Sequence, residues 1–400
     1  MPHTRSKDET NSAGQAAGVW PGTCRMPAEW ETHEATWLAW PHYRKDWPGK
    51  FAPIPWVYSE IIRYLAKHEG IELIVKDAVA ENEAKEILER ANALSSSIRF
   101  HRWPTDRVWM RDSGCLFVAH DGGSTPDGQR LGTRHSAGGT SRAAIAARAS
   151  MAQSSLYAVK WRFNAWAKYS NWRLDETIGA RMAKAVRARQ LLPVFGNERI
   201  VLEGGAIDVN GQGSLITTEE CLLSSEQQRN PGMGREDYEK IFRDYLGSRA
   251  VIWLGGGIVG DDTHGHVDDL CRFIAPHTVV TMVERNRHDP NHDTLEDNLR
   301  RLRAARDQDG QPLQIVEVPM PAAIIFEKRR LPASYANFYI ANGLVLVPVF
   351  NDPNDRIALD ILSALLPGRD VVGIYAGDLI WGLGAIHCMT QQQPSIGRKL

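Results

Sequence analysis

The 400-residue chain is 43% hydrophobic and 24% charged, which is the composition of an ordinary globular protein. Its formal net charge of −1 gives no global field that would favour nucleic acid or an anionic membrane. The cysteines are odd in number, widely spaced and without a CxxC pair, which argues against a disulfide framework and a cysteine-rich zinc site. They are Cys24, Cys115, Cys221, Cys271 and Cys388.

The amino-terminal segment is polar and lacks the apolar core of a secretory signal. No apolar run approaches the roughly 20 residues that span a bilayer. We therefore expect a reducing, cytoplasmic location, and we interpret residues 1–20 as a disordered tail.

Short β-type runs alternate with helical periodicity along the chain, which predicts an α/β protein. The expected strands are 36–40, 71–75, 98–102, 115–119, 200–203, 251–254, 278–283, 314–318, 343–350 and 371–375. The expected helices are 55–68, 79–94, 176–190, 235–246, 292–306 and 356–366. Residues 206–218 predict a hairpin that turns at Asn210-Gly211, and Asp293 with Glu296 predicts a capping box.

One segment, residues 120–154, differs from the rest of the chain. It is rich in Gly, Ser, Ala and Arg and shows no strand pattern. We interpret it as a mobile surface insertion. The alternative is a single helix over 141–152.

Three polar clusters each follow or abut a predicted strand, and their spacing is regular. Glu203 and His266 lie 63 residues apart, and His266 and Cys388 lie 122 apart, which is twice 61. Without about 30 residues of the insertion, the interval from Asp112 to Glu203 is also near 61. A period of this size predicts stacked or radially arranged units that each bring a strand end to one centre. The clusters are 109-WMRDSG-114, 203-EGGAID-208 and 264-HGHVDD-269.

If those strand ends converge, one site holds a thiol, an imidazole and several carboxylates. Cysteine hydrolases for amides seldom need several acids at the scissile carbon. Two carboxylates that face a guanidinium, however, make bidentate, charge-assisted hydrogen bonds to it. A histidine nearby can protonate departing ammonia and then activate water. The pattern therefore predicts that Cys388 is the nucleophile of a guanidine hydrolase.

Seven blocks of the chain resemble the agmatine deiminase and bacterial peptidylarginine deiminase family. The resemblance runs from about Met26 to Pro394, and the blocks together are highly specific. They are 26-MPAEWETHEATWLAWPH-42, 109-WMRDSG-114, 161-WRFNAW-166, 203-EGGAIDVNGQGSLITTEECLL-223, 265-GHVDDLCRF-273, 335-YANFYIANG-343 and 384-GAIHCMTQQQ-393.

The resemblance implies the α/β pentein fold, a fivefold pseudosymmetric α/β-propeller of ββαβ units around a central site. It implies one catalytic domain over residues 21–395, without a metal or organic cofactor. The implied reaction hydrolyses agmatine to N-carbamoylputrescine and ammonia through a covalent S-amidino-cysteine intermediate, which would feed polyamine synthesis. A homo-oligomer that binds a small guanidine, and neither nucleic acid nor membrane, is implied as well.

The family's catalytic set maps onto a defined group of residues here. Asp112 and Asp268 would clamp the guanidinium, and Trp109 would form a wall of the substrate site. Glu203 would orient the histidine, and His387 is interpreted as a structural neighbour rather than a second base. The implied catalytic residues are Cys388, His266, Glu203, Asp112 and Asp268.

The chain departs from the family pattern close to the expected pocket. Cys115 stands where proline is usual, Leu383 stands in what is often a three-glycine run, and 164–169 lacks the usual glycines. These departures leave open the end of the substrate that is not guanidine. The surplus of acids favours the dication agmatine, whereas Lys168 is a cation that could pair with the carboxylate of arginine, peptidylarginine or a guanidino acid.

Three readings from other classes remain as alternatives. The run 264-HGHVDD-269 is near the ligand pattern of some zinc-dependent hydrolases. The run 255-GGGIVG-260 spells a dinucleotide-binding fingerprint, but no helix pattern follows it. A binding protein for cations could be built from Trp and acids, although it would have no need of a thiol and a histidine.

Overall fold

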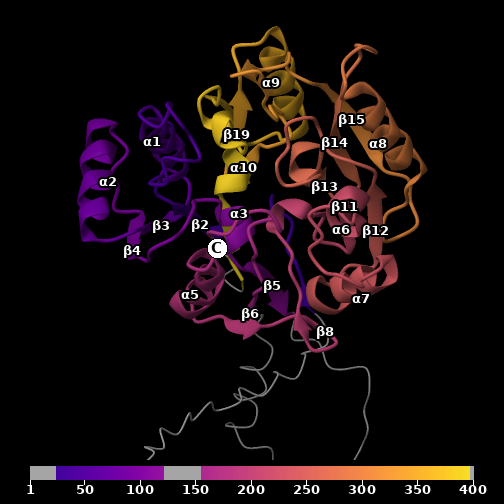
Figure 1. The fold of residues 1–400 in the computed structure, drawn as a ribbon, viewed down its shortest axis with the longest axis horizontal. Coiled ribbons are helices and arrows are strands. Elements are labelled where there is room, and N and C mark those ends of the chain that lie inside the picture. The colour runs from indigo at the N-terminus through magenta and orange to yellow at the C-terminus, as the bar shows by residue number, and fades with distance from the viewer. Residues whose placement is uncertain (1–23, 121–154, 397–400) are drawn as a thin grey trace, which may run out of the picture.

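The computed structural model describes residues 24–120 and 155–396. Within those ranges, five small sheets stand around a common centre, and helices line the outside of the ring (Figure 1). Each sheet contains two antiparallel strands and a third strand that joins in parallel. A parallel neighbour requires a crossover connection, and in every unit that crossover includes a helix. The strand orders are β21-β2-β3-β4, β1-β5-β6-β7, β10-β11-β12, β13-β14-β15 and β18-β19-β20.

The first unit combines the two ends of the described chain. Strand β21 pairs antiparallel with β2, and Trp37 lies opposite Gln391 in that ladder. The last strand of the chain therefore closes the ring. The elements of this unit are β2 (His33–Ala39), α1 (Ile54–Leu65), β3 (Gly70–Val75), α2 (Ala78–Arg90), β4 (Ile98–Arg102) and β21 (Gln391–Pro394).

The other four units follow in chain order. The second consists of β5 (Leu116–His120), β6 (Ser155–Val159), α5 (Ile178–Ala185) and β7 (Arg189–Leu191), with β1 (Cys24–Arg25) at its edge. The third consists of β10 (Asp208–Val209), β11 (Ser214–Thr218), α6 (Glu219–Leu223), α7 (Arg235–Leu246) and β12 (Ala250–Leu254). The fourth consists of β13 (Cys271–Ala275), β14 (Thr278–Val283), α8 (His292–Ala304) and β15 (Gln314–Pro319). The fifth consists of β18 (Tyr339–Ala341), β19 (Leu344–Val349), α9 (Pro353–Leu365) and β20 (Asp370–Tyr375).

This arrangement confirms the predicted pentein fold of ββαβ units. Strands β10, β13 and β18 begin at Asp208, Cys271 and Tyr339, so the units repeat after 63 and 68 residues. The repeat explains the spacing of the polar clusters, because corresponding positions of successive units face the same centre.

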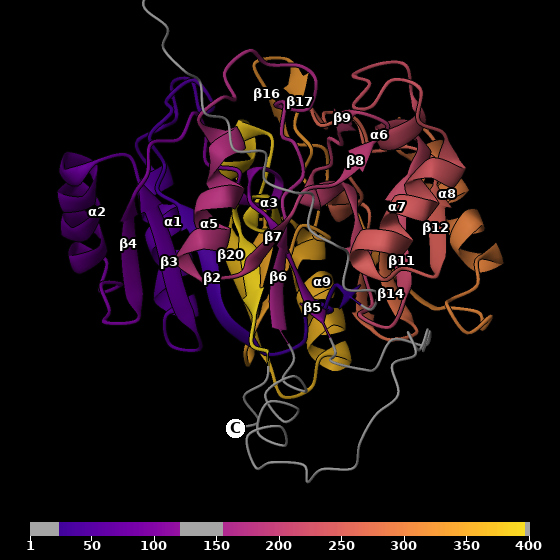
Figure 2. The same ribbon diagram turned by 90° about the horizontal axis from the view of Figure 1, so that it is seen from below.

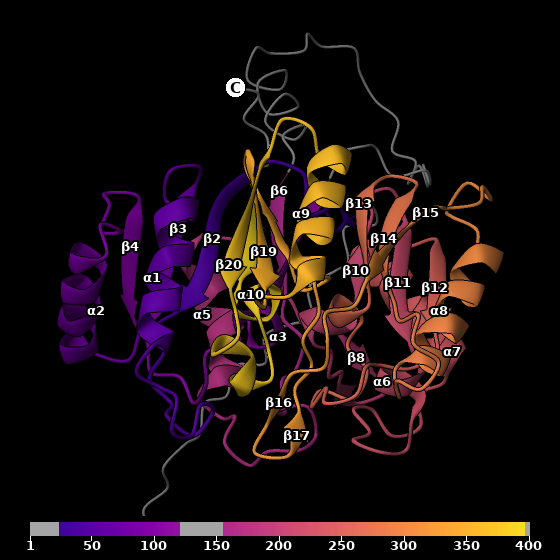
Figure 3. The same cartoon turned by 90° about the horizontal axis from the view of Figure 1, so that it is seen from above.

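Two short hairpins lie outside the five sheets. One consists of β8 (Val194–Phe195) and β9 (Glu198–Arg199), and the other of β16 (Ile325–Phe326) and β17 (Arg329–Arg330). Figures 2 and 3, which view the ring from its side, show the β16–β17 hairpin on one of its two faces.

Apolar faces explain how the outer helices attach to the ring. Helix α7 buries Tyr238, Ile241, Phe242 and Leu246, which share one face at helical spacing. It ends at Gly247, whose φ of +74° is left-handed, and a Cβ there would lie 2.2 Å from the Cys24 carbonyl oxygen. The larger apolar core continues along the ring, while a second cluster, which includes Val118, Trp161 and Phe242, joins the second and third units.

Two predicted elements were wrong. Residues 200–203 are not a strand, because Asn230 takes both backbone groups of Val201: its Oδ1 accepts from the N–H at 2.8 Å, and its Nδ2 donates to the carbonyl at 2.7 Å. Helix α8 has no capping box, because it begins at His292 and Asp293 bonds the imidazole of His292 instead of the backbone.

The predicted tail and insertion lie outside the described residues, except for His120, which ends β5. Their boundaries, and the single domain over 21–395, stay predictions. His120 and Ser155, which flank the insertion, are partners in the β5–β6 ladder. In the described part of the chain, no helix is both long and apolar enough to cross a bilayer.

Candidate active site

Cys388 lies on the short helix α10 (Ile386–Met389), beside α3 (Met110–Ser113) at the centre of the ring (Figure 1). Asn337 holds this helix and its thiol. Its Oδ1 accepts from the backbone N–H of His387 at 3.0 Å and of Cys388 at 3.3 Å, while its Nδ2 donates to Sγ at 3.1 Å. The same Nδ2 donates to Asp269. Asn337 therefore fixes the direction of the thiol.

Asp112 enters the centre from α3, and both of its carboxylate oxygens are bonded. Oδ1 accepts from the backbone N–H of Gly205 at 3.0 Å, and Oδ2 accepts from the indole N–H of Trp166 at 2.9 Å. Burial raises the pKa of Asp112, and the nearby carboxylates Asp268 and Glu203 add to that shift.

Asp268 enters from the 3-10 helix η3 (Val267–Asp269) and reaches the nucleophile directly. Its Oδ2 lies 3.6 Å from Sγ of Cys388 and 2.7 Å from Nδ1 of His387. Burial opposes its charge, but the bond to His387 lowers the pKa of Asp268 below its usual value.

Gly205 marks the point at which three of the predicted site residues converge. A Cβ on this residue would lie 2.5 Å from Nδ1 of His266, 3.0 Å from Oδ2 of Asp268 and 3.1 Å from Oδ1 of Asp112. Glycine is therefore required here by the close approach of three side chains. Two carboxylates and one imidazole face the same small volume beside Cys388.

His266 lies between acids and is fully buried. Its Nδ1 is 3.9 Å from Oδ2 of Asp112, and its Nε2 is 3.9 Å from Oε2 of Glu203. Burial opposes protonation, but Asp112, Cys221 and Glu203 together raise the pKa of His266 well above its usual range. Its imidazole is therefore held as a cation in the free site.

Glu203 is held by an arginine in addition to facing His266. Arg229, which was not expected in the site, donates from Nε to Oε1 of Glu203 at 3.1 Å. Although burial raises the pKa of a carboxyl, Arg229 and His266 lower that of Glu203 to about 2. The carboxylate beside the imidazole is therefore ionised at all physiological pH values.

The Cys388 thiol, the predicted nucleophile, lies near several carboxyl groups. Burial raises the pKa of the Cys388 thiol well above its usual value, and Asp268, Asp269 and Asp112 raise it further. Cys388 is therefore a neutral thiol in the free site at pH 7. A positive charge bound between the carboxylates would favour the thiolate.

His387, which the sequence analysis interprets as a structural neighbour, contacts two carboxylates. Its Nδ1 bonds Asp268, and its Nε2 lies 2.9 Å from Oε2 of Glu29. Glu29 is also paired with Arg272 at 3.0 Å and with Arg111 at 3.3 Å. Both ring nitrogens of His387 are therefore engaged in holding carboxylates.

A cavity of about 570 Å³ leads to Cys388 and Asp112. Trp109 forms its wall next to the nucleophile, because a Cβ on Gly384 would lie 2.7 Å from the Trp109 ring and 3.1 Å from Cβ of Cys388. Trp166 and Trp381 also line it. The cavity therefore has aromatic walls and leads to the Cys388 thiol and the Asp112 carboxylate.

The departures from the family pattern coincide with unusual backbone. Leu383, which lines the cavity, has a φ of +68°. Ala165, Trp166 and Ala167 have φ of +52°, +58° and +53°. The backbone of a residue other than glycine is strained in this left-handed region, and such strain is typical of binding sites. Cys115 is fully buried, and burial raises the pKa of its thiol to about 12.

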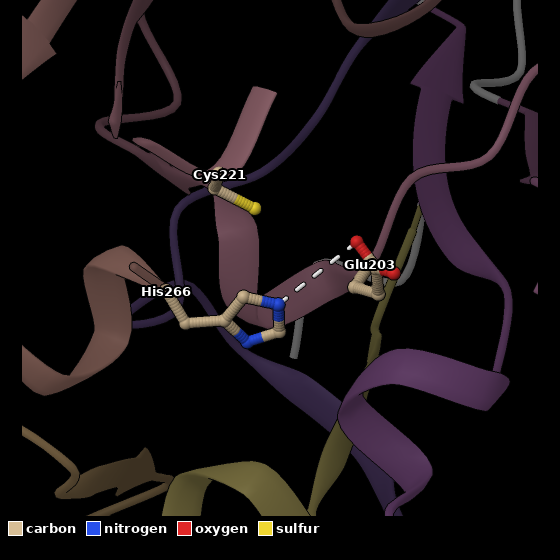
Figure 4. Close-up of side chains that lie close together, drawn as sticks. All are labelled: Glu203, Cys221 and His266. Carbon is tan, nitrogen blue, oxygen red and sulfur yellow. Dashed lines mark ion pairs between the residues drawn. The ribbon is translucent and has the colours of Figure 1, made fainter. Parts of the chain in front are cut away.

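One group of side chains could hold a metal ion in the part of the chain that the structure describes: Glu203, Cys221 and His266, whose ligand atoms lie within 4.8 Å of one another. Figure 4 shows that these side chains come from separate segments and point toward one another. The grouping differs from the histidine-rich zinc pattern. His264 faces Glu220 at 3.4 Å and Ser224 at 3.2 Å instead of joining His266.

The predicted site residues are brought together around Cys388 and Gly205. The analysis of the sequence missed Asn337, Arg229, Trp166 and Glu29, which hold the reacting groups. A local signal existed for Glu29, Trp166 and Asn337, which lie inside blocks of the resemblance, whereas Arg229 lies outside every block. The 255–260 glycine run leads into turns rather than a helix, so the structure gives no support to a dinucleotide site there.

Comparisons with known proteins agree with this geometry. The sequence pattern of the Porphyromonas-type peptidyl-arginine deiminases matches residues 25–394. An agmatine deiminase of Pseudomonas aeruginosa (strain LESB58) is 31% identical over 394 residues, covering 93% of this chain and 95% of that protein. One from Stutzerimonas stutzeri (strain A1501) is 31% identical over 393 residues, covering 92% and 95%. The solved agmatine deiminase of Enterococcus faecalis superposes with a TM-score of 0.77 at 28% identity, covering 94% of this chain and 98% of that one.

Proposed function

This chain belongs to the Porphyromonas-type peptidyl-arginine deiminase family, and on that premise we propose that it is an agmatine deiminase. It hydrolyses a C–N bond of the agmatine guanidinium and yields N-carbamoylputrescine and ammonia. The observation that carries the proposal is the convergence on Gly205, where two carboxylates and an imidazole face one point beside a buried thiol. Such a group matches a planar cation that is attacked at its central carbon.

In this mechanism, the guanidinium lies between Asp112 and Asp268. The carboxylates accept its N–H groups and keep its carbon electrophilic. Trp109 packs against it from the wall of the cavity. Because the guanidinium offsets the charge of the acids, its arrival lowers the pKa of the Cys388 thiol, which loses its proton to solvent and becomes the nucleophilic thiolate.

The thiolate of Cys388 attacks the guanidinium carbon and forms a tetrahedral species. His266 donates a proton to one amino group, the C–N bond breaks, and ammonia leaves. The remaining S-amidino-cysteine is then attacked by water, whose proton passes to His266. The hydroxyl proton of this second tetrahedral species passes to sulfur as the C–S bond breaks, so the carbamoyl product departs and the thiol is restored. Glu203, held by Arg229, keeps the imidazole in position through both proton transfers.

The test is an assay of ammonia release with four substrates: agmatine, arginine, 4-guanidinobutyrate and an arginyl peptide. We expect agmatine to give the highest kcat/KM. Higher kcat/KM with arginine, the guanidino acid or the peptide would keep the chemistry and change the substrate. Failure to release ammonia from every one of them would overturn the proposed function.

The surroundings in which the enzyme works are part of the proposal. The family resemblance supports a cytoplasmic homo-oligomer with no organic cofactor or metal. Light scattering of the purified chain would test the oligomer, and a monomer would contradict it.

A further inference from the structure

The cavity that leads to Cys388 is lined by charged as well as aromatic side chains. Cations and carboxylates line it together, so the charge of an entering group depends on which of them are still free to bind. Besides Asp112, the charged side chains there are Lys45, Asp46, Arg107, Lys168, Asp262 and Arg329.

Asp262 is already saturated by neighbours. Lys168 and the Tyr169 hydroxyl both donate to its carboxylate, one to each oxygen. Arg329 lies 3.7 Å from Oδ1 as well. A ligand cation would have to displace one of these donors. The same contacts occupy Lys168 and Arg329, which a ligand carboxylate would otherwise use.

Asp46 is engaged on one side only. Its Oδ1 accepts from Arg107, whose guanidinium also reaches Asn171 and stacks 4.1 Å from the Tyr169 ring centre. Among the described side chains, none makes a hydrogen bond of standard geometry to Oδ2, although this oxygen is buried. The residue is 8% exposed and lines the cavity. Trp109 acts on the Asp46 carboxyl as a hydrogen-bond donor that lowers its pKa, but the contact does not meet standard hydrogen-bond geometry at Oδ2.

We propose that Oδ2 of Asp46 binds the distal ammonium of the substrate, and so selects guanidines that carry a primary amine at their far end. The inference rests on the proposed function, since it concerns the other end of the same substrate. A buried carboxylate oxygen without a donor is unfavourable, and an ammonium supplies the missing charge-assisted hydrogen bond.

The geometry also explains why a carboxylate would be a poor occupant. It would approach the open oxygen of Asp46, and the two like charges would repel. Three of the cavity's cations, Arg107, Lys168 and Arg329, are each already paired with an acid. A carboxylate that used one of these three would have to break its pair, which leaves Lys45 as the other cation of the lining.

The test compares agmatine with butylguanidine, which keeps the guanidinium and the four-carbon chain but lacks the amine. For the unaltered enzyme we expect agmatine to exceed butylguanidine in kcat/KM by roughly ten- to a hundredfold, the range of one hydrogen bond to a charged group. Asp46→Asn should remove most of that preference, chiefly by raising the KM of agmatine, while kcat/KM for butylguanidine stays unchanged.

Asp262→Asn is the matched control, because it makes the same chemical change in the other carboxylate of this region. It should alter kcat/KM for the two substrates by the same factor and leave their ratio intact. Thermal melting of both variants checks that they fold.

Three results would overturn the inference. The unaltered enzyme could use both guanidines equally, which decides the matter even if Asp46→Asn does not fold. Asp46→Asn could lower both substrates by the same factor, which would indicate a purely structural role beside Arg107. The ratio could instead depend on Asp262. Absence of turnover with either guanidine is different, because it would refute the proposed function itself.

Discussion

Arg229 and Glu203 form an ion pair in which neither side chain has exposed surface, with Nε 3.1 Å from Oε1. The pair places a fixed negative charge beside His266. Arg229 Nη1 and Nη2 also donate to the backbone carbonyls of Gln227 and Thr263, so the arginine links the loop before α7 to the loop before η3. Arg229 therefore keeps Glu203 ionised and in place, and Glu203 in turn stabilises the protonated imidazole of His266.

Replacing Arg229 by Met should therefore harm folding and catalysis together. The change leaves Glu203 buried without its partner, and removing one member of a buried pair costs about 3–5 kcal/mol of unfolding free energy. Urea unfolding measures that loss, and steady-state kinetics measure the fall in kcat. Arg300→Met is the control, since Arg300 pairs with Asp297 at the surface and its loss should change stability little. A variant at position 229 as stable as the parent would contradict the expected effect.

Cys388→Ala should abolish turnover and leave the fold intact, because the mechanism requires a covalent bond to Sγ. Acid quenching of the unaltered enzyme during turnover should add one amidine mass to the peptide that contains Cys388. Cys24→Ala is the control and should keep full activity, because Cys24 lies on β1, away from the cavity lining. Turnover by the Cys388 variant would disprove the covalent route.

The raised pKa of Cys388 predicts slow alkylation of the free enzyme at neutral pH. Only the thiolate reacts, and its fraction grows with pH until the pH passes the pKa. The rate of inactivation by iodoacetamide should therefore continue to rise above about pH 8.5, where an ordinary thiol levels off. Agmatine should slow inactivation by occupying the site. A plateau below pH 8.5 would show that the thiolate is stabilised in the free enzyme.

The Asp46 carboxyl predicts a pH dependence of substrate preference. Burial raises its pKa to about 6, with Arg107 and Trp109 opposing that shift and Asp262 adding to it; Asp46 in turn raises the pKa of the buried Tyr58. An ammonium binds the ionised carboxylate, so the preference is present above this pKa and lost as the pH falls through it. The ratio of kcat/KM for agmatine and butylguanidine should fall in acid, and it should be flat in Asp46→Asn. A ratio independent of pH in the parent enzyme would argue against the role of Asp46.

Replacing residues 121–154 by a short Gly-Asn link should leave the thermal midpoint nearly unchanged. His120 and Ser155 are already partners in one antiparallel ladder, so a tight turn can join them. The cost of closing a loop also changes slowly with its length. Differential scanning calorimetry measures the midpoint, and a large fall would show that the replaced segment contributes to stability.

The sequence predicted the group of candidate catalytic residues because the fold repeats. Asp112, Glu203, His266 and Cys388 lie just before the strands β5, β10, β13 and β21 of four of the five units, and their spacing carried that information. The groups that hold them were harder to find, because their contacts join residues far apart in the chain. Glu29 meets His387 across 358 positions, and no local pattern marks such a pair.

Strand β21 was missed for a different reason. Its glutamines are usually found at surfaces, yet here they are buried. Gln393 Oε1 accepts from the Trp37 indole at 3.1 Å, and Gln392 Oε1 accepts from Arg111 at 2.7 Å. These polar partners make a buried strand of residues that show no apolar pattern.

The closure of the ring by β21 on β2 has a consequence for biosynthesis. Strand β2 cannot pair with β21 until Pro394, the partner of His33, has been synthesised. The first unit to leave the ribosome is therefore the last to be completed. Contacts between such distant parts of a chain form slowly, since the intervening chain must first be ordered. Cys388 lies just before the closing strand, so the step that closes the ring also brings the proposed nucleophile beside its carboxylates. A chain that is truncated before Cys388 lacks both the closing strand β21 and the thiol. We therefore expect no activity from such a chain.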